Sequence, residues 1–371
     1  MRVALVHDWL TGMRGGEKAL ERLCEIFPQA ELFTLIHVKG SVSPLIEDRP
    51  IHTAFTQHLP FAAHAYRHFL PLFPSAIERL DFRGFDLVVS CSHCVAKSVI
   101  VPEGVPHICY CLTPMRYAWD QFDAYFGPQK VGRMASAALG PVLRRLARWD
   151  QATAPRPNRY LAISQYVARR IGLYYNRQSS IVYPPVDTEY FTPAAVAPKA
   201  TFVIVSALVP YKRLELAIDA AHAAHLPLDI IGDGPERSTL ELRAARGPGV
   251  RLLGRLDDAA VRERYRTAAA VLLPGEEDFG IVPVEAQACG RPVVALARGG
   301  ATETVIDGVT GLLVDDDTVP AWSDALTRAS ATTWPADRIR AHAERFSHER
   351  FRAEFRAAVS EVLAAPRGQR W

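Results

Sequence analysis

Residues 277–285 decide how the rest of the chain is understood, and they run Glu277-Asp278-Phe279-Gly280-Ile281-Val282-Pro283-Val284-Glu285. Two carboxylates flank a turn that leads from a predicted strand, Ala269–Leu273, into a predicted helix. We expect Glu277 on the loop and Glu285 about two turns into the helix, so that both face the helix N-terminus. Backbone N–H groups attract anions there. The stretch therefore predicts a site for a polyol that carries a phosphate.

Short apolar strands alternate with helical segments on both sides of this stretch. In the first half we expect strands at Val3–Val6, Leu87–Val89, Ile108–Cys111 and Arg159–Ile163, and a helix at Glu17–Phe27. In the second half we expect them at Phe202–Val205, Leu228–Ile231, Val250–Leu253 and Pro292–Ala295. Buried strands that alternate with helices are typical of parallel sheets covered on both faces. The sequence predicts an α/β protein with two doubly wound, Rossmann-like domains.

Prolines mark the boundary between the two halves. Tyr183-Pro184-Pro185-Val186-Asp187 and the Pro/Ala-rich run Thr192–Ala200 predict a linker. We expect an N-terminal domain at residues 1–185, a C-terminal domain at 186–345 and a last segment at 346–371. Trp334–Leu363 has a helical pattern with a break near Phe346-Ser347-His348, and the pattern alone lets it pack on either domain. Two such domains form a cleft, which is the usual place for a ligand.

Composition narrows the classes of protein. The chain has 371 residues, 49% of them hydrophobic, and a net charge of +3, so nothing in it argues for nucleic-acid binding. The N-terminal residues predict a buried strand instead of a signal peptide, and no apolar run approaches the roughly 20 residues that span a bilayer. We expect a cytoplasmic protein.

The cysteine spacing is faintly similar to that of a zinc site. Cys91-Ser92-His93-Cys94 and Cys109-Tyr110-Cys111 are closely spaced pairs, as structural zinc sites prefer. Each pair lies in or just after an apolar run, where cysteine more often serves as a small buried hydrophobe. We therefore expect no metal, disulfide or catalytic thiol at these residues.

Four turns follow predicted strands and carry glycine or cationic residues. They are Gly12-Met13-Arg14-Gly15-Gly16-Glu17-Lys18, Pro210-Tyr211-Lys212-Arg213, Ile231-Gly232-Asp233-Gly234 and Arg298-Gly299-Gly300. Glycine lets a ligand approach the backbone, although a plain tight turn explains the first of them as well. Cations at a helix N-terminus oppose the helix dipole, so Lys212 and Arg213 favour diphosphate binding over a solvated helix start.

These segments together resemble one family. Glu277–Glu285 with Phe279-Gly280 is similar to the E-x7-E motif of retaining family 4 glycosyltransferases, which have the GT-B fold. Further motifs of a bacterial branch cover nearly the whole chain: His7-Asp8-Trp9-Leu10, Gly15-Gly16-Glu17-Lys18, Thr113-Pro114-Met115-Arg116-Tyr117-Ala118-Trp119-Asp120, Ile163-Ser164, Tyr183–Asp187, Val209–Arg213 and Gly232–Pro235. That branch resembles O-antigen and exopolysaccharide mannosyltransferases. The resemblance implies that the last helix returns to the N-terminal domain.

The resemblance also implies roles for individual residues. Glu277 would accept hydrogen bonds from the donor sugar, Glu285 would bind the ribose, and Lys212 would neutralise the diphosphate leaving group. The remaining donor-side residues are Arg213, the backbone of Phe279, Gly280 and Ile281, and Gly232, Gly234, Gly299, Gly300 and Ala207. On the acceptor side they are Gly15, Gly16, Glu17, His93, Thr113, Arg116 and Tyr117. No metal and no cofactor would be required.

Two positions depart from the family pattern. Ala207 stands where relatives carry an arginine that shares the diphosphate, and Leu112 stands where many carry a histidine. Loss of one cation at a developing phosphate charge weakens transition-state stabilisation by several kcal/mol. A nucleotide-sugar-binding protein that no longer catalyses is therefore one alternative, and a sugar-nucleotide epimerase of the same fold is another.

The expected reaction is transfer of mannose from GDP-mannose to a glycan or a polyprenyl-diphosphate-linked oligosaccharide in cell-surface polysaccharide synthesis. Residues 130–149 interleave arginines with apolar side chains, which predicts either an anionic membrane surface as a partner or an ordinary amphipathic helix. Gly140-Pro141 is expected to break this stretch. Phe61–Phe73, which is rich in His and Arg, is a second candidate surface on the acceptor side. The protein is then expected at the inner face of the plasma membrane.

Overall fold

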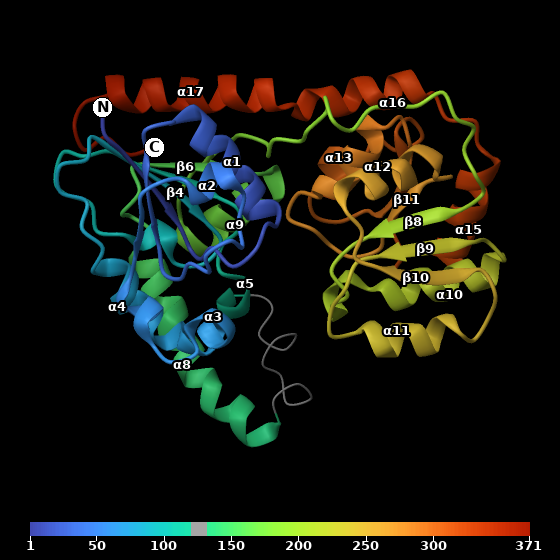
Figure 1. The fold of residues 1–371 in the computed structure, drawn as a ribbon, viewed down its shortest axis with the longest axis horizontal. Coiled ribbons are helices and arrows are strands. Elements are labelled where there is room, and N and C mark those ends of the chain that lie inside the picture. The colour runs from blue at the N-terminus through green and yellow to red at the C-terminus, as the bar shows by residue number, and fades with distance from the viewer. Residues whose placement is uncertain (120–131) are drawn as a thin grey trace. The chain divides into compact units, whose positions relative to one another are not determined.

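The computed structural model describes residues 1–119 and 132–371, except for the side chains of Tyr117 and residues 133–138. The chain separates into two compact units, one of residues 1–185 with 351–371 and the other of residues 186–350 (Figure 1). The first boundary lies within the Pro184-Pro185 segment. The return to the first unit comes at Phe351, five residues later than the sequence suggested.

The first unit contains a seven-stranded parallel sheet in the order β3-β2-β1-β4-β5-β6-β7. Its strands are β1 (Val3–His7), β2 (Glu31–Thr34), β3 (Ile51–Thr53), β4 (Leu87–Ser92), β5 (His107–Cys111), β6 (Arg159–Ala162) and β7 (Ser180–Ile181). The strand order reverses between β1 and β4. Ligands of doubly wound sheets bind at such a switch point, beyond the carboxyl ends of the strands.

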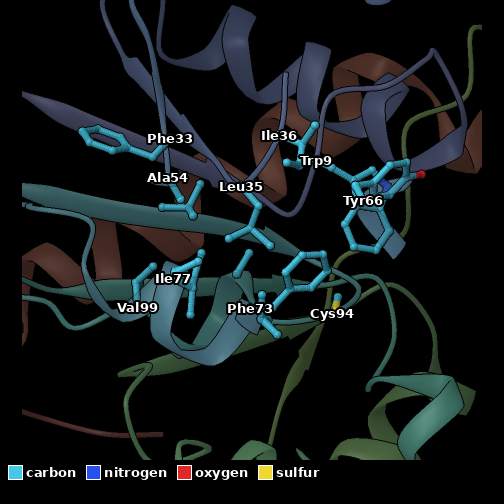
Figure 2. Close-up of a cluster of buried hydrophobic side chains, with 14 of the residues drawn as sticks. Trp9, Phe33, Leu35, Ile36, Ala54, Tyr66, Phe73, Ile77, Cys94 and Val99 are labelled. Atoms are coloured by element: carbon cyan, nitrogen blue, oxygen red, sulfur yellow. The ribbon is translucent and has the colours of Figure 1, made fainter. Parts of the chain in front are cut away.

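Helices cover both faces of this sheet (Figure 1). They are α1 (Gly15–Ile26), α2 (Pro44–Glu47), α3 (Ala62–Ala65), α4 (Phe73–Glu78), α5 (Arg116–Trp119), α8 (Arg133–Ala152) and α9 (Gln165–Tyr175), with 3-10 turns η1 (Phe55–His58), η2 (Tyr66–Leu72) and η3 (Ala96–Ser98). One hydrophobic cluster joins the sheet to α4 and α8, and Figure 2 shows Trp9, Phe33 and Phe73 within it. The cluster fixes the loops that follow β1 and β4.

The expected break at Gly140-Pro141 is wrong, because α8 continues through Pro141. Pro141 is exposed, whereas Leu143 and Leu146 are buried in the hydrophobic cluster. Burial of one apolar face outweighs the hydrogen bond that proline removes. The described apolar side chains of this face pack inward, and Arg144, Arg145 and Arg148 remain exposed. In this respect α8 is an amphipathic surface helix.

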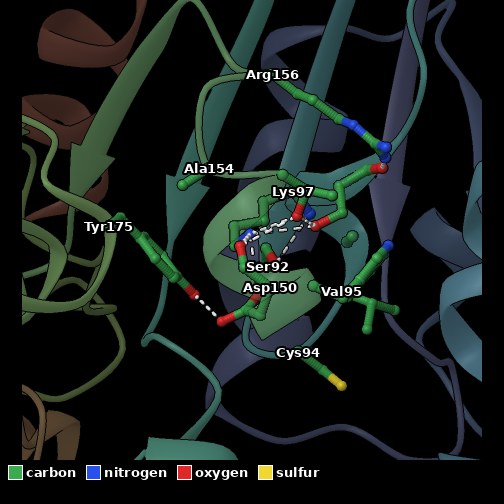
Figure 3. A network of polar contacts seen from close by, with 12 residues as sticks. Ser92, Cys94, Val95, Lys97, Asp150, Ala154, Arg156 and Tyr175 are labelled. Carbon is green, nitrogen blue, oxygen red and sulfur yellow. Dashed lines mark hydrogen bonds and ion pairs between the residues drawn. The ribbon is translucent and has the colours of Figure 1, made fainter. Parts of the chain in front are cut away.

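A buried ion pair anchors the C-terminal end of α8 (Figure 3). The Lys97 ammonium lies 2.9 Å from Asp150 Oδ1, and both side chains are almost inaccessible to solvent. Asp150 Oδ2 also accepts hydrogen bonds from Tyr175 (2.9 Å) and from the indole of Trp119 (2.8 Å). A buried charge is tolerated when it is paired and hydrogen-bonded in this way. The network ties η3, α5, α8 and α9 together.

The second unit contains a six-stranded parallel sheet in the order β10-β9-β8-β11-β12-β13. Its strands are β8 (Phe202–Val205), β9 (Leu228–Ile231), β10 (Val250–Gly254), β11 (Val271–Leu273), β12 (Val293–Leu296) and β13 (Gly311–Val314). Its helices are α10 (Leu214–Ala224), α11 (Arg237–Ala244), α12 (Asp258–Thr267), α13 (Ile281–Ala288), α14 (Ala301–Thr304), α15 (Val319–Ala331) and α16 (Ala336–Ala343), with 3-10 turns η4 (Pro210–Lys212) and η5 (Glu344–Phe346). Both sheets are parallel and doubly wound, as the sequence predicts.

The last helix, α17 (His348–Ala364), begins in the second unit and continues into the first. Within the first unit, the Phe355 ring lies 6.4 Å from the Phe27 ring and 5.9 Å from the Tyr110 ring. Phe351 contacts the same tyrosine at 5.6 Å. The sequence pattern left open which domain the final segment joins, and these buried aromatic rings decide it.

The six cysteines are buried, and none of them forms a disulfide in the described part of the chain. Burial raises the pKa of the Cys24 thiol and of the Cys289 thiol to about 12. Thiols in such surroundings act as small hydrophobes. Among the described residues, no helix has the length and apolarity to cross a bilayer.

Candidate functional site

The E-x7-E stretch lies at the carboxyl end of β11, where the chain turns into α13. Gly280 precedes the helix and has a φ of +88°, a backbone conformation that residues other than glycine rarely adopt. Glu277 lies on the loop, as predicted. Glu285 is the fifth residue of α13, a little more than one turn from its start, and so nearer the N-terminus than the two turns expected.

Lys212 and Glu277 form an ion pair beyond the carboxyl ends of β8 and β11. Their side chains are only 16% and 18% exposed, although the two residues belong to loops after different strands. Gly275 makes the approach feasible, because a Cβ atom there would lie 2.7 Å from both Lys212 Cα and the Tyr211 carbonyl oxygen. The backbone of one loop therefore lies directly against the other. A cation and a carboxylate predicted from separate motifs are brought together.

Glu285 is buried within the second unit and has a hydroxyl partner. The Tyr265 hydroxyl of α12 donates a hydrogen bond of 3.1 Å to Glu285 Oε2. Burial, reinforced by the neighbouring Glu285 carboxylate, holds the pKa of Tyr265 well above its ordinary value, so the phenol stays protonated and donates. A buried glutamate in an apolar helix requires a cation or a hydroxyl as a partner, and Tyr265 supplies a hydroxyl.

Arg213 is committed to a different carboxylate. It adopts a left-handed conformation with φ +53° at the start of α10, and its guanidinium pairs with Asp317. Arg298 approaches the same carboxylate at 3.4 Å. The Arg213 hydrogen bond holds the pKa of Asp317 below its ordinary value. Asp317 belongs to none of the motifs found in the sequence, so its pairing with a predicted donor-site cation was not predicted.

Close backbone packing accounts for the glycines of this site. A Cβ on Gly232 would lie 1.8 Å from the Ser206 carbonyl oxygen, and one on Gly234 would lie 2.4 Å from that of Leu208. A Cβ on Gly299 or Gly300 would collide with Glu277 or Phe279 backbone atoms at 2.3 Å.

The Glu277 loop itself packs closely against Gly299 and Gly300, and the ligand approach inferred for these glycines stays a prediction. The Gly300 N–H donates a bond of 2.8 Å to the Glu277 carbonyl. Ala207 is exposed on the loop after β8. Its two neighbours in the chain, Ser206 and Leu208, are the residues that Gly232 and Gly234 contact.

In the first unit, Asp8 organises the loop that follows β4. Its carboxylate accepts four backbone hydrogen bonds of 2.6–3.0 Å, from His93, Cys94, Val95 and Ala96. The His93 Nδ1 atom lies 3.2 Å from Asp8 Oδ2. Burial lowers the pKa of His93 and the Asp8 charge opposes that shift only in part, so the imidazole is neutral at pH 7. Asp8 therefore presents His93 at the switch point of the first sheet.

His7 and Glu17 form a second buried pair, near the carboxyl end of β1. His7 Nε2 lies 3.6 Å from Glu17 Oε1, and a Cβ on Gly16 would lie 3.0 Å from Leu112 Cδ1 and 3.5 Å from the imidazole. Burial alone lowers the pKa of His7, but interactions with Cys91 and Glu17 outweigh burial and raise it well above its ordinary value. Burial likewise raises the pKa of Glu17, and His7 reverses that, leaving it lowered. Gly15 is the first residue of α1.

The other predicted acceptor-side residues lie near α5. Thr113 Oγ1 accepts a hydrogen bond of 2.5 Å from Arg170 of α9. Arg116 begins α5 and is half-buried. The Tyr117 side chain lies outside the described residues. The roles assigned to these three residues and to Gly15, Gly16, Glu17 and His93 stay predictions.

Three residues of the second-unit site escaped the sequence analysis: Tyr265, Gly275 and Asp317. Gly275 carried a usable signal, because a glycine just after a strand is typical of close backbone approach. Tyr265 had none, since an aromatic residue on a helix face predicts core packing equally well. The arrangement holds one ammonium, one partly exposed carboxylate and one buried carboxylate around the start of α13. Such a set can bind hydroxyl groups and an anion together.

Residues 187–346 match the family described as glycosyl transferases group 1. Among curated proteins, the chain is 36% identical over 222 residues to the D-inositol 3-phosphate glycosyltransferase of Kribbella flavida, covering 51% of each chain. It is 33% identical over 233 residues to that of Mycolicibacterium smegmatis, covering 53% of each. The chain thus spans about half the length of these relatives.

Two solved structures resemble the whole chain. HepE from Anabaena in complex with UDP has a TM-score of 0.71 at 18% identity, covering 97% of this chain and 100% of that one. The apo form of the lipopolysaccharide outer core galactosyltransferase WaaB has a TM-score of 0.69 at 16% identity, covering 97% and 99%. The two parallel-sheet units are those of the GT-B fold, as the sequence predicted.

Proposed function

We propose that the protein is a retaining glycosyltransferase that takes its sugar from a nucleotide-sugar donor. The contact between Lys212 and Glu277 at the start of α13 carries this proposal, because it sets a diphosphate-binding cation beside a carboxylate that can hold sugar hydroxyls. The match of residues 187–346 to glycosyl transferases group 1 supports it. The buried Glu285, further along the same helix, is assigned to the ribose.

Each assigned residue has a distinct part in the transfer. The bond between the anomeric carbon and the diphosphate oxygen breaks, and the acceptor hydroxyl oxygen bonds to that carbon from the same face. Lys212 and the N–H groups at the start of α13 stabilise the charge that develops on the diphosphate. The departing phosphate oxygen takes the acceptor's proton. Partly exposed ion pairs contribute only about 1 kcal/mol or less, so the donor can replace the Lys212–Glu277 contact at little cost.

GDP-mannose is the proposed donor, and it rests on the similarity of the sequence motifs to bacterial mannosyltransferases. The solved complexes of HepE with UDP and with UDP-glucose make uridine donors the first comparison. We assign the acceptor to the first unit, near His93 and Gly16, and propose a glycan or polyprenyl-diphosphate-linked oligosaccharide. The names of the curated relatives make D-inositol 3-phosphate the second acceptor to compare.

We propose that the reaction needs no divalent metal, since Lys212 and the helix N-terminus supply the positive potential that a metal would otherwise provide. Donor turnover in excess chelator should equal that in excess Mg²⁺. A strict requirement for Mg²⁺ or Mn²⁺ would overturn this part of the proposal.

We further propose that the protein works at the inner face of the plasma membrane. The exposed arginines Arg144, Arg145 and Arg148 of α8 support this, as does Phe61, which is 80% exposed among the histidines of α3 and η2. Cations and an exposed aromatic ring suit an anionic lipid surface. Flotation with vesicles should depend on anionic lipid. Absence of binding at low salt would contradict it.

A donor panel tests the central proposal. The protein is incubated with GDP-mannose, UDP-glucose and other nucleotide sugars, and nucleotide release and sugar products are followed with and without acceptor. Acceptor-dependent release of nucleotide with a new α-linked product supports the proposal. Binding without release would establish the non-catalytic alternative, and conversion of the donor to an epimeric sugar nucleotide would establish the epimerase.

A further inference from the structure

A cavity with a largely polar lining lies in the second unit, at the opposite end of the parallel strands from Lys212 and Glu277. Its volume is about 250 Å³. Thr201 precedes β8, Asp229 is the second residue of β9, and Arg251 is the second residue of β10, so the cavity adjoins the amino ends of the strands. The donor-site residues follow the carboxyl ends. A ligand in this cavity is therefore separate from the donor.

The cavity is built on a buried carboxylate. Asp229 is 1% exposed and lies directly opposite Arg251 in the register between β9 and β10. Arg251 donates to it from Nε at 2.8 Å and from Nη2 at 3.0 Å, and Arg264 of α12 donates from Nη1 at 2.7 Å. One carboxylate thus holds two guanidinium groups in fixed positions. Their orientation is set before any ligand binds, which lowers the entropic cost of binding.

Both guanidinium groups have donors left over. An arginine carries five N–H donors, and the bonds to Asp229 occupy two on Arg251 and one on Arg264. Their side chains are 62% and 41% exposed. Lys199 also lines the cavity, and its ammonium makes no hydrogen bond or ion pair with any residue that the structure describes. Three cations therefore surround a space with donors to spare.

The charge balance favours an anion. Besides the three cations, the cavity wall contains the carboxylates of Asp229 and Glu263. Asp229 is saturated by the two arginines, and Glu263 is turned to Arg266, which it meets at 2.7 Å. A tetrahedral oxyanion offers acceptors in three directions to the three cations, whereas a carboxylate offers two oxygens in one plane.

We propose that this cavity, lined by Lys199, Arg251 and Arg264, binds the phosphate group of a small phosphorylated molecule. The site is independent of the proposed transfer reaction. It uses arginine in the way proteins commonly do for phosphate, with a rigid and planar donor set. Asp229 acts as the positioning residue that keeps both guanidinium groups in place.

The test is calorimetric titration of the full chain with inorganic phosphate at pH 7.5, with chloride added to match ionic strength. Lys199→Gln is the primary variant, because Lys199 has no contact with Asp229 and its loss leaves the buried carboxylate paired. Arg251→Gln is the second, checked by circular dichroism for folding. We expect each to weaken phosphate binding about tenfold, as loss of one charge-assisted hydrogen bond implies.

Two further variants locate the bound phosphate. Lys212→Gln removes the donor-site cation, and Arg328→Gln removes an exposed arginine of α15 that pairs only loosely with Asp324 at 3.8 Å. Both should retain a phosphate site of wild-type affinity. Binding that disappears in Lys212→Gln but persists in Lys199→Gln and Arg251→Gln would place phosphate at the donor site and overturn the proposal, as would the absence of any binding.

A third arm separates a free phosphorylated molecule from a lipid headgroup. Glycerol 3-phosphate in solution should compete with inorganic phosphate in wild-type protein and lose affinity in Lys199→Gln. Capture by vesicles containing phosphatidic acid, together with no response to either free phosphate, would overturn the assignment to a small molecule.

Discussion

The Tyr265 hydroxyl donates a hydrogen bond of 3.1 Å to the Glu285 carboxylate, and both side chains are buried in the second unit. The tyrosine comes from α12 and the glutamate from α13. A carboxylate in such surroundings needs hydrogen-bond donors to stay charged. Tyr265 therefore donates a hydrogen bond that helps to orient the residue that we assign to the ribose.

Tyr265→Phe removes the donor while keeping the aromatic ring. We expect the donor KM to rise about tenfold with a smaller change in kcat, since a hydrogen bond to a charged group is worth about 1.5–3 kcal/mol. Tyr190→Phe is the matched control, because the Tyr190 hydroxyl bonds to none of the described residues. Steady-state kinetics with the preferred donor measures both. An unchanged KM in Tyr265→Phe would show that Glu285 keeps its position without it.

Glu277→Ala should reduce transfer by about a hundredfold or more, which is the scale on which transition-state hydrogen bonds act. The Glu277 and Lys212 side chains are only 18% and 16% exposed, so circular dichroism should accompany the assay to show that the fold survives. Glu276→Ala, at the preceding loop residue, should stay close to wild type. Full activity in Glu277→Ala would refute the assignment of this residue to the donor sugar.

Gly275→Ala tests the contact that brings Lys212 to Glu277. The new methyl group would lie 2.7 Å from Lys212 Cα, so the two loops must separate. We expect kcat to fall about tenfold, as small misplacements of catalytic groups produce losses of this order or more. Gly172→Ala in α9 meets no atom within 4 Å and should leave kcat unchanged while raising the melting temperature. Equal activities in the two variants would contradict the positioning role of Gly275.

Ala207→Arg should raise the rate of transfer. Ala207 is exposed on the loop after β8, so a long side chain can be accommodated there without disturbing the core. An added cation near the diphosphate would stabilise the charge that develops on the leaving group. Initial rates at saturating donor measure the effect, with Ala207→Gln as the uncharged control. No change in turnover or in donor affinity would exclude a diphosphate contact at this position.

The His7–Glu17 pair predicts how stability depends on pH. The pKa of His7 is raised, so its stabilisation is complete below its unfolded value and is lost as the pH rises through the folded value. The pKa of Glu17 is lowered, so its stabilisation is present above its unfolded value and is lost as the pH falls through the folded value. Between these limits both charges are present.

Glu17→Gln should cost about 3 kcal/mol of unfolding free energy at neutral pH, because it leaves a buried imidazolium without its counter-ion. The difference from wild type should shrink at high pH, once His7 loses its proton, and at low pH, once Glu17 gains one. Urea unfolding across the pH range measures this, and Glu241→Gln in an exposed helical pair is the control. A difference independent of pH would rule out the ion pair as its source.

Much of the fold could be predicted from the sequence because its parallel strands are buried on both faces. Strand β1 is apolar up to its last residue, His7, and β4 is apolar or small throughout, so both runs are apparent in the sequence. The strands β2, β3, β7 and β13 were missed, since they are short and carry polar or glycine residues. Pro141 was wrongly expected to end a helix, because a local rule ignores the burial of Leu143 and Leu146.

The residues of the candidate site also fall into those that the sequence predicted and those that it did not. The motif Glu277–Glu285, the turns with their glycines and the cations Lys212 and Arg213 were all apparent as local patterns. Tyr265 and Asp317 were not, because neither carries a local mark of the residue it meets. Gly275 did carry a signal, a glycine just after a strand, but that signal does not name the loop it packs against. The packing of Gly299 and Gly300 against the backbone of Glu277 and Phe279 was not apparent from the local pattern either.

The sequence by itself determined the alternation of strands and helices, the boundary at Pro184-Pro185 and the side chains available at each turn. These follow from apolar periodicity and backbone preferences, which act between near neighbours in the chain. Only the tertiary structure decided that Lys212 pairs with Glu277 and that Tyr265 donates a hydrogen bond to Glu285. It also decided that Asp229 pairs with two arginines near the amino ends of the strands. Such pairs form where loops and strands distant in sequence pack at van der Waals distance, and only the folded packing brings those backbones together.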